Sequence, residues 1–190
     1  MTIIGVVLAG GKSSRYGKPK MFETYKGKQF YEHSVDALKD NSLAPIIIST
    51  NDQLSPSFQR DDILLILEEQ PHQGPLYAIY QVMSQVPDAE WFFVLSCDIP
   101  FVTSTFVSKM IGYVDSDQYD AIVPIQSGRL QPLLALYHRR NVKRIEQLLV
   151  EKQRKIRLLL DDVRTLTVPF PADDKVFTNM NYQEDWLDHN

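Results

Sequence analysis

Cysteine is almost absent from this sequence. Cys97 is the single cysteine among 190 residues, which excludes an internal disulfide framework. The four histidines have no cysteine or histidine neighbours at the spacing of zinc ligands. Both features suit a reducing compartment, and we expect a cytoplasmic protein.

Long apolar runs and an excess of basic charge are also missing. The runs ILLIL and WFFVL are far shorter than the roughly 20 residues that a membrane helix needs. The apolar start, residues 1–9, lacks the basic residues of a secretory signal. A net charge of −4 disfavours the basic face that nucleic-acid binding requires. We therefore expect neither a membrane nor a nucleic acid as partner.

Short apolar runs are what the sequence does have. They predict strands, and several are continuous rather than alternating, as in parallel sheets covered on both faces. The predicted strands are 3–8, 44–50, 62–68, 91–96, 120–125, 132–137 and 165–170.

Helical patterns fall between these strands. They cover residues 30–38, 76–83 and 106–114, with Thr103 and Ser104 as N-cap candidates, and a fourth helix capped by Asn141 runs to Val150. The alternation predicts one α/β domain over residues 1–190, a three-layer Rossmann-like fold with a mixed, mostly parallel sheet and helices on both faces. A hairpin at Ser127–Gly128 predicts an antiparallel element after Asp120.

Four predicted strands end in loops of unusual composition, and parallel strands bring such loops to one edge of a sheet. The first loop, AGGKSSRYGKPK, joins two glycines to four cations. Glycines here allow positive φ and close backbone approach, so their N–H groups can bind phosphate, and the cations add charge. The alternative is a solvated basic loop. Val6 and Lys12 stand where a Walker A loop and a dinucleotide fingerprint, respectively, require glycine, so neither motif fits.

The later loops supply further candidates. Asp98, just past the strand 91–96, suits Mg²⁺ beside bound phosphates, although an aspartate before proline also commonly closes a turn. Cys97 is expected to be buried packing. Gly74 and Pro75 fit the start of a helix, whose free N–H groups favour anions or carbonyls.

The opening loop matches a longer pattern, LAGG-x-S-x-R-x-G-x-x-K, and resembles the start of nucleotidyltransferases with a GT-A-like fold. Four further motifs follow it in the chain: GPL, SCDIPF, QPLLALY and NMNYQEDW. Together these motifs make the sequence similar to the molybdenum cofactor guanylyltransferase family over nearly the whole chain. The resemblance implies Mg²⁺-dependent transfer of GMP from GTP to molybdopterin, with release of pyrophosphate. It also implies a nucleotide-binding half at about residues 1–100 and an acceptor-binding half at about 101–190.

The resemblance assigns roles residue by residue. Leu8, Ala9 and Gly10 would contact guanine and ribose through the backbone, and Gly11 to Arg15, with Ser13, would hold the phosphates. Arg15, Lys20 and Asp98 would be catalytic, with Lys20 at the α-phosphate and Asp98 on Mg²⁺. Further nucleotide contacts would come from Ser49, Gly74, Pro75 and either Glu68 or Glu69, of which we prefer Glu69. Gln131, Pro132, Asn179 and Asn181 would lie on the molybdopterin side.

One departure and several alternatives remain. Tyr77–Ala78 replaces the family's usual Ala–Gly after Gly–Pro–Leu, which puts close approach at that helix start in question. A cytidylyltransferase for the same cofactor, a nucleotidyltransferase for a sugar or isoprenoid phosphate, and a non-catalytic nucleotide-binding module are the rival functions. The oligomeric state is open, as is an accessory GTP-binding protein or molybdoenzyme chaperone.

Overall fold

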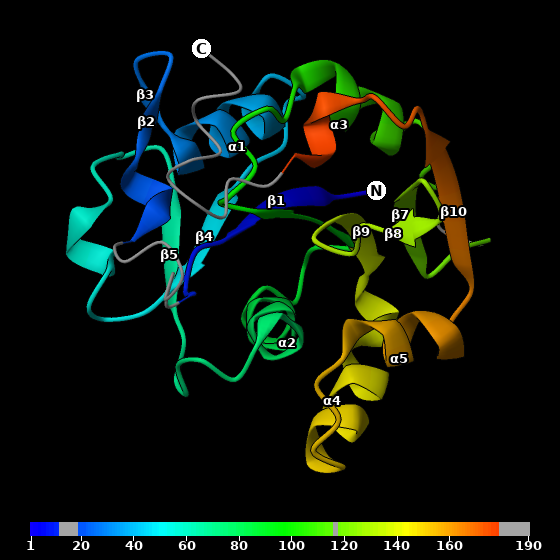
Figure 1. The fold of residues 1–190 in the computed structure, drawn as a ribbon. Helices are drawn as coiled ribbons and strands as arrows, with labels where there is room; N and C mark the ends of the chain where they lie inside the picture. Colours follow the sequence, from blue (N-terminus) through cyan, green and yellow to red (C-terminus); the bar gives the residue numbers. More distant parts are fainter. Residues whose placement is uncertain (12–18, 116–117, 179–190) are drawn as a thin grey trace.

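The computed structural model describes residues 1–11, 19–115 and 118–178 (Figure 1). An eight-stranded mixed sheet crosses the molecule in the order β10-β7-β9-β6-β1-β4-β5, and the short β8 pairs with β7. The strands are β1 (Ile3–Leu8), β4 (Ile46–Thr50), β5 (Leu64–Leu67), β6 (Trp91–Ser96), β7 (Ala121–Gln126), β8 (Arg129–Leu130), β9 (Leu134–His138) and β10 (Thr165–Phe170). The predicted fold class is confirmed.

Helices cover both faces of this sheet, with α1 and α3 on one side and α2, α4 and α5 on the other (Figure 1). Short 3₁₀ turns and a small hairpin of β2 and β3 connect them. The bounds are α1 (Phe30–Lys39), α2 (Pro75–Gln85), α3 (Ser104–Ile111), α4 (Val142–Val150), α5 (Ile156–Asp162), β2 (Thr24–Tyr25), β3 (Lys28–Gln29), η1 (Lys20–Phe22), η2 (Ser55–Ser57), η3 (Arg139–Asn141) and η4 (Lys175–Phe177).

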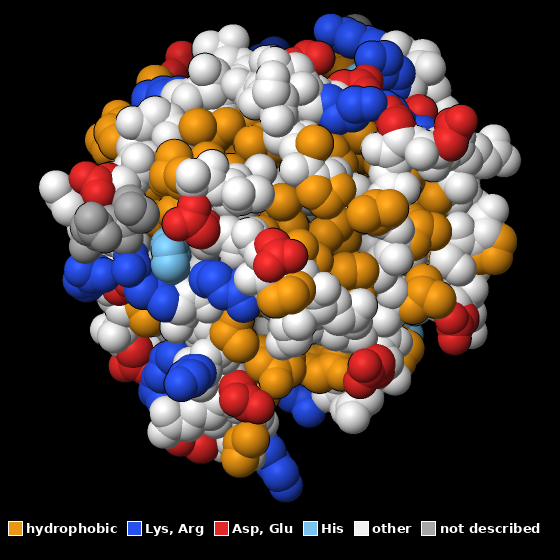
Figure 2. All heavy atoms as spheres, turned by 180° about the vertical axis from the view of Figure 1, so that it is seen from behind, with side chains coloured by type: hydrophobic (Ala, Val, Ile, Leu, Met, Phe, Trp, Pro, Cys, Tyr) orange, Lys and Arg blue, Asp and Glu red, His pale blue; other side chains and the backbone are white. Residues whose placement is uncertain are grey.

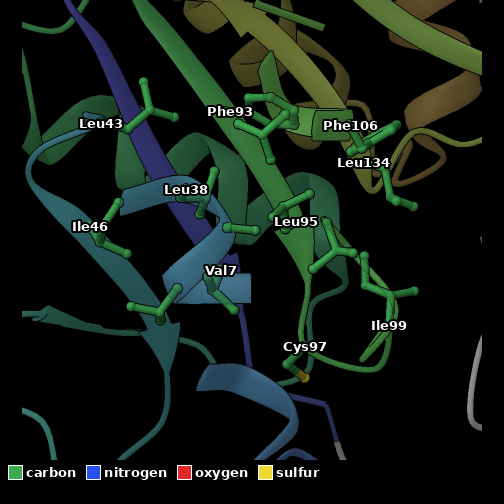
Figure 3. Packing of buried hydrophobic residues seen from close by; sticks show 14 of the residues in the cluster. Val7, Leu38, Leu43, Ile46, Phe93, Leu95, Cys97, Ile99, Phe106 and Leu134 are labelled. Atoms are coloured by element: carbon green, nitrogen blue, oxygen red, sulfur yellow. The ribbon is translucent and has the colours of Figure 1, made fainter. Parts of the chain in front are cut away.

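The sheet separates two hydrophobic cores because successive side chains of a strand point to opposite faces. In β6, Phe93 and Leu95 pack toward α1 and α3, whereas Phe92 and Val94 belong to the cluster on the α2 side. Figure 3 shows the first core, in which Leu38 of α1 lies with residues of β1, β4 and β6. All four of these side chains are fully buried. Burial of one such side chain stabilises the folded state by about 1.5–3 kcal/mol relative to leaving it exposed.

Four strands run parallel side by side, and their carboxyl ends meet at one edge. β1 pairs with β6 and with β4, and β4 pairs with β5. The last residue of β1, Leu8, is level with Ser96 of β6 and with Ser49 of β4. The predicted gathering of four loops at one edge is therefore confirmed.

The antiparallel element predicted after Asp120 is present, but its pairing differs in detail. Ser127 and Gly128, with φ values of 49° and 75°, form a two-residue hairpin turn that joins β7 to the short β8. The next strand, β9, runs antiparallel between β6 and β7. This insertion brings the start of β9 and the ends of β7 and β10 to the same edge as the four loops.

Two predicted caps have different outcomes. The hydroxyl of Thr103 accepts a hydrogen bond from the Phe106 N–H at 3.1 Å, so the cap of α3 is confirmed. Asn141 occupies the N-cap position of α4 but its side chain does not cap. Its amide donates instead to the Asp120 carbonyl at 2.7 Å and ties α4 to β7.

The surface is mixed in character. The face seen from behind carries acidic and basic side chains around a broad central area of apolar side chains (Figure 2). At the end of the sheet, β5 leaves Leu64, Leu65 and Leu67 exposed. Within the part of the chain that the structure describes, no helix is long and apolar enough to cross a membrane.

Candidate active site

The glycine loop after β1 is seated on the end of β4. The Ala9 N–H donates to the Ser49 carbonyl at 2.8 Å, and the Thr50 hydroxyl donates to the Ala9 carbonyl at 3.1 Å. Neither Gly10 nor Gly11 adopts positive φ, so these two glycines do not use the left-handed backbone that their position allows. Gly10 has a different feature, the close approach of a neighbouring side chain, which would have to move to admit a Cβ atom.

That neighbour is Glu68, the residue after β5. A Cβ atom on Gly10 would lie 2.0 Å from the Oε1 atom of Glu68. Glu68 is half-buried, and its Oε2 accepts a hydrogen bond from the His72 N–H at 3.3 Å. Burial raises the pKa of the Glu68 carboxyl above its ordinary value. Glu69, which we preferred from the sequence, is exposed, so the carboxylate at the loop is that of Glu68.

Asn51 is a residue of this edge that sequence reasoning missed. Its Oδ1 accepts the N–H groups of Gln53 and Leu54 at 3.1 and 3.2 Å, and its Nδ2 donates to the Gly10 carbonyl at 3.4 Å. The predicted Ser49 lies deeper: its side chain is 1% exposed, and its hydroxyl has no hydrogen-bond partner among the described residues. An asparagine directly after the run IIIST was the available signal, because such residues form turns with their own backbone.

Lys20 and Asp98, which were predicted to act on the α-phosphate and on Mg²⁺, form an ion pair at this edge. The Lys20 Nζ donates to the Asp98 Oδ2 at 2.7 Å, and the two side chains are 15% and 18% exposed. The Ser96 hydroxyl donates to the other oxygen, Oδ1. Asp98 thus has a donor on each oxygen, with its residue in the turn just past β6.

Lys20 is held in place by an aromatic cluster beneath it. Lys20 is the first residue of η1. In this turn the Met21 side chain is buried, and the Phe22 ring packs against two other aromatic rings. The Phe22 ring lies 4.9 Å from that of Phe58 and 6.1 Å from that of Tyr31. The contacts of Phe22 therefore hold the backbone of η1 in place, and the Lys20 side chain reaches Asp98 from there.

The start of α2 agrees with the sequence. Gly74 is the N-cap with φ of 95°, and Pro75 is the first helical residue. The Gly74 carbonyl accepts the Tyr77 and Ala78 N–H groups at 3.2 and 3.3 Å. Tyr77 is only half-buried here, so the larger side chain does not prevent this helix start.

The acceptor residues divide into described and undescribed ones. Gln131 and Pro132 precede β9 at the same edge; the Gln131 N–H donates to the Pro124 carbonyl at 2.9 Å, and the Tyr137 hydroxyl donates to the Pro132 carbonyl at 2.7 Å. The predicted residues Lys12, Ser13, Arg15, Lys18, Asn179 and Asn181 lie outside the described residues.

A divalent cation at Asp98 fits the donors that are present. Among residues 1–11, 19–115 and 118–178, no three His, Cys, Asp or Glu side chains form a group able to hold a metal alone. A metal that takes one or two carboxylates and completes its shell with phosphate oxygens and water needs no such group. Asp98 at the edge beside the glycine loop can supply that carboxylate.

The fold and this edge, a glycine loop facing an acidic residue on a Rossmann-like sheet, are those of a nucleotidyltransferase. The profile of the MobA-like NTP transferase domain matches residues 5–166. The chain is 36% identical over 190 residues to the probable molybdenum cofactor guanylyltransferase of Geobacillus sp. (strain WCH70), with 97% and 96% of the two chains covered.

Other relatives agree. A second probable molybdenum cofactor guanylyltransferase, from Halalkalibacterium halodurans, is 35% identical over 189 residues, covering 96% of this chain and 94% of the relative. The crystal structure of molybdopterin-guanine dinucleotide biosynthesis protein A from Archaeoglobus fulgidus superposes with a TM-score of 0.76 at 21% identity, over 99% of this chain and 96% of that one. The chain therefore belongs to the MobA-like NTP transferase family, whose members typically require a divalent metal.

Proposed function

We propose that this protein transfers GMP from GTP to molybdopterin, forming the molybdopterin guanine dinucleotide cofactor and releasing pyrophosphate. The observation that carries the proposal is the Lys20–Asp98 pair at 2.7 Å, beside the loop of Gly10 and Gly11. A carboxylate for a metal and a cation for a phosphate are what nucleotidyl transfer needs at its reacting phosphorus. The names of the relatives at 36% and 35% identity supply the acceptor and the base.

The reaction is an in-line displacement. The terminal phosphate oxygen of molybdopterin forms a bond to the α-phosphorus of GTP, and the bond from that phosphorus to the pyrophosphate oxygen breaks. No covalent enzyme intermediate is needed, since positioning and charge neutralisation carry such chemistry. Lys20 moves from Asp98 to the α-phosphate and, with Arg15, offsets its charge.

The remaining roles are those that the resemblance assigns. The backbone of Leu8, Ala9 and Gly10 holds the nucleoside, Glu68 beside Gly10 makes a further nucleotide contact, and the N–H groups from Gly11 onward bind phosphate. Mg²⁺ held by Asp98 would supply positive charge between the α-phosphate and the departing pyrophosphate. Gln131 and Pro132, with Asn179 and Asn181, form the acceptor side.

Binding of GTP, CTP and ATP, measured by calorimetry with Mg²⁺, tests the nucleotide. We expect GTP to bind best, and Asp98→Ala to weaken binding and abolish pyrophosphate release with molybdopterin while the circular dichroism spectrum stays unchanged. An active Asp98→Ala enzyme contradicts the assignment. A preference for CTP moves the protein to a cytidylyltransferase, and a failure to release pyrophosphate with any acceptor leaves a nucleotide-binding module.

Partner proteins are tested separately. An accessory GTP-binding protein or a molybdoenzyme chaperone would receive or deliver the cofactor, and light scattering of the mixture and of the protein alone reports on both association and oligomeric state.

A further inference from the structure

Ser96 is a polar residue in a strand whose other members are fully buried and apolar or aromatic. The five residues before it in β6, Trp91 to Leu95, are all 0% exposed. Ser96 ends this strand, level with Leu8 at the base of the glycine loop. A hydroxyl at this position has no packing role that alanine could not fill, so its contacts indicate its purpose.

Its backbone is fixed by three neighbours. The Ser96 N–H donates to the Leu133 carbonyl at 2.9 Å, and the Ser96 carbonyl accepts from the Ser34 hydroxyl of α1 at 3.4 Å. Pairing with β1 supplies the third constraint. The side chain of Ser96 therefore projects from a rigid point of the sheet, which is the kind of support that a reacting constellation needs.

The Ser96 hydroxyl donates to Oδ1 of Asp98, while Lys20 donates to Oδ2 at 2.7 Å. Hydrogen bonds to a carboxylate are short and strong. A carboxylate oxygen has two lone pairs, so Oδ1 can accept from Ser96 and still ligate a cation. Together the two donors fix the plane of the Asp98 carboxylate.

The two donors differ in what happens when nucleotide binds. In the reaction proposed above, Lys20 leaves Asp98 for the α-phosphate. Among the described residues, Ser96 is then the donor that still holds Asp98. Its contribution is thus greatest in the state in which the carboxylate must hold the metal.

We propose that Ser96 is a positioning residue, which keeps Asp98 oriented toward the metal–nucleotide complex after Lys20 has transferred to phosphate. The inference rests on the proposed function. Hydrogen-bond partners of metal ligands typically contribute 10- to 100-fold in metal affinity, because they fix the orientation of the ligand. A serine two residues before its aspartate can do so here because Ser96 ends a rigid strand and Asp98 lies in the turn just past it.

Binding of Mn²⁺ in the presence of GTP, followed by the electron paramagnetic resonance signal of the free ion, tests this without turnover. We expect Ser96→Ala to weaken Mn²⁺ binding by about tenfold, and Ser96→Thr, which keeps the hydroxyl, to restore it. Ser84→Ala is the matched control, because that hydroxyl donates to the Tyr80 carbonyl within α2 at 2.8 Å and not to Asp98. The midpoint of thermal unfolding should be the same for all three within a few degrees.

The outcomes separate the two proposals. If Asp98→Ala loses Mn²⁺ and Ser96→Ala does not, or if Ser96→Thr loses as much as Ser96→Ala, the positioning role is wrong and the function stands. If Asp98→Ala binds Mn²⁺ as the unmodified protein does, the metal assignment itself fails. Should Ser96→Ala not fold, Ser96→Cys, nearly isosteric but a weak donor, gives the same comparison.

Discussion

Gly10 and the carboxylate of Glu68 occupy one shared space: a Cβ atom at residue 10 would lie 2.0 Å from the Glu68 Oε1 and 2.8 Å from its Cδ. The two residues follow different strands, β1 and β5, and β4 lies between these strands in the sheet. A larger residue at the first glycine would therefore have to displace the Glu68 carboxylate, whereas the backbone of Gly10 is not left-handed.

Gly10→Ala should displace the Glu68 carboxylate and weaken GTP binding by about tenfold, or about 1.4 kcal/mol. Gly11→Ala is the matched control, because a Cβ at Gly11 meets no described atom within 4 Å and alanine keeps the N–H group. Calorimetric titration of GTP into both variants makes the comparison. In a Glu68→Ala background the Gly10→Ala change should have little further effect, and full additivity of the two losses would contradict the shared-space explanation.

Asp120 gives the fold an acid-sensitive link. Its side chain is 11% exposed and accepts from the Nε and Nη2 atoms of Arg164, both at 3.0 Å, and it pairs with Arg140. Hydrogen bonding to Arg164 lowers the pKa of Asp120 from 3.8 to about 2. The carboxylate form therefore stabilises the folded state above about pH 4, and this contribution is lost as the pH falls toward 2.

Asp120→Asn should accordingly lower the free energy of unfolding by about 1–2 kcal/mol at pH 7, a value reduced for solvent screening of the arginines. Urea denaturation at pH 7 and at pH 3 measures the difference, which should narrow at the lower pH. Asp88→Asn, at an exposed carboxylate, serves as control. An equal loss at both pH values would show that the charge of Asp120 is not the cause.

Arg60 links the segment before β5 to helix α1. Its Nε and Nη2 donate to the two oxygens of Asp62 at 2.8 and 2.7 Å, and its Nη1 donates to Asp36 at 2.7 Å. Because the guanidinium is 18% exposed and makes paired contacts, we expect Arg60→Gln to cost about 1 kcal/mol in urea denaturation.

The control for this prediction is Arg157→Gln, which removes an exposed ion pair with Asp161 one helical turn away. Exposed pairs of this spacing contribute about 0.3–0.5 kcal/mol. The Arg60 loss should shrink in 1 M salt, and equal losses for the two variants would contradict a special role for the Arg60 network.

Cys97 should be inert in the folded protein. It is 6% exposed, and burial raises the pKa of its thiol from 9.0 to about 12, so little thiolate exists at pH 8. Ellman's reagent should therefore react within minutes only after urea is added. Rapid reaction of the native protein at pH 8 would show that the turn after β6 opens readily.

How far the sequence predicts this molecule depends on which contacts define each feature. The strands at 3–8, 91–96 and 165–170 are confirmed to the residue, because each is a short β-branched or aromatic run with clear breaks. Helix α5 was missed, since its seven residues follow the charged stretch EKQRK too closely to show a period. The two-residue strands β2 and β3 were also missed; they form a local hairpin whose turn, Lys26 and Gly27, has φ values of 47° and 79°, but each strand is too short to show alternation.

In the candidate site, too, some features follow from local sequence and others depend on contacts that the sequence does not show. The sequence predicts Lys20 and Asp98 at the same edge because each belongs to a motif that follows a predicted strand, but it does not predict the ion pair between them. The choice between Glu68 and Glu69 depends on the direction in which one carboxylate points after β5 ends at Leu67, and adjacent identical residues give no signal for that. Asn51 was missed because its side chain donates a hydrogen bond to the Gly10 carbonyl, and Gly10 lies 41 residues away along the chain.

The insertion of β9 between β6 and β7 has a consequence for how the chain is made. Until Leu134–His138 has left the ribosome, the nascent chain has no partner for the open side of β6, whose residues Trp91 to Leu95 β9 will cover. Residues up to the end of β6 thus emerge with an apolar strand as a sheet edge, and such edges attract other chains. The order of the strands therefore leaves this edge uncovered for as long as the ribosome takes to extend the chain from β6 to β9.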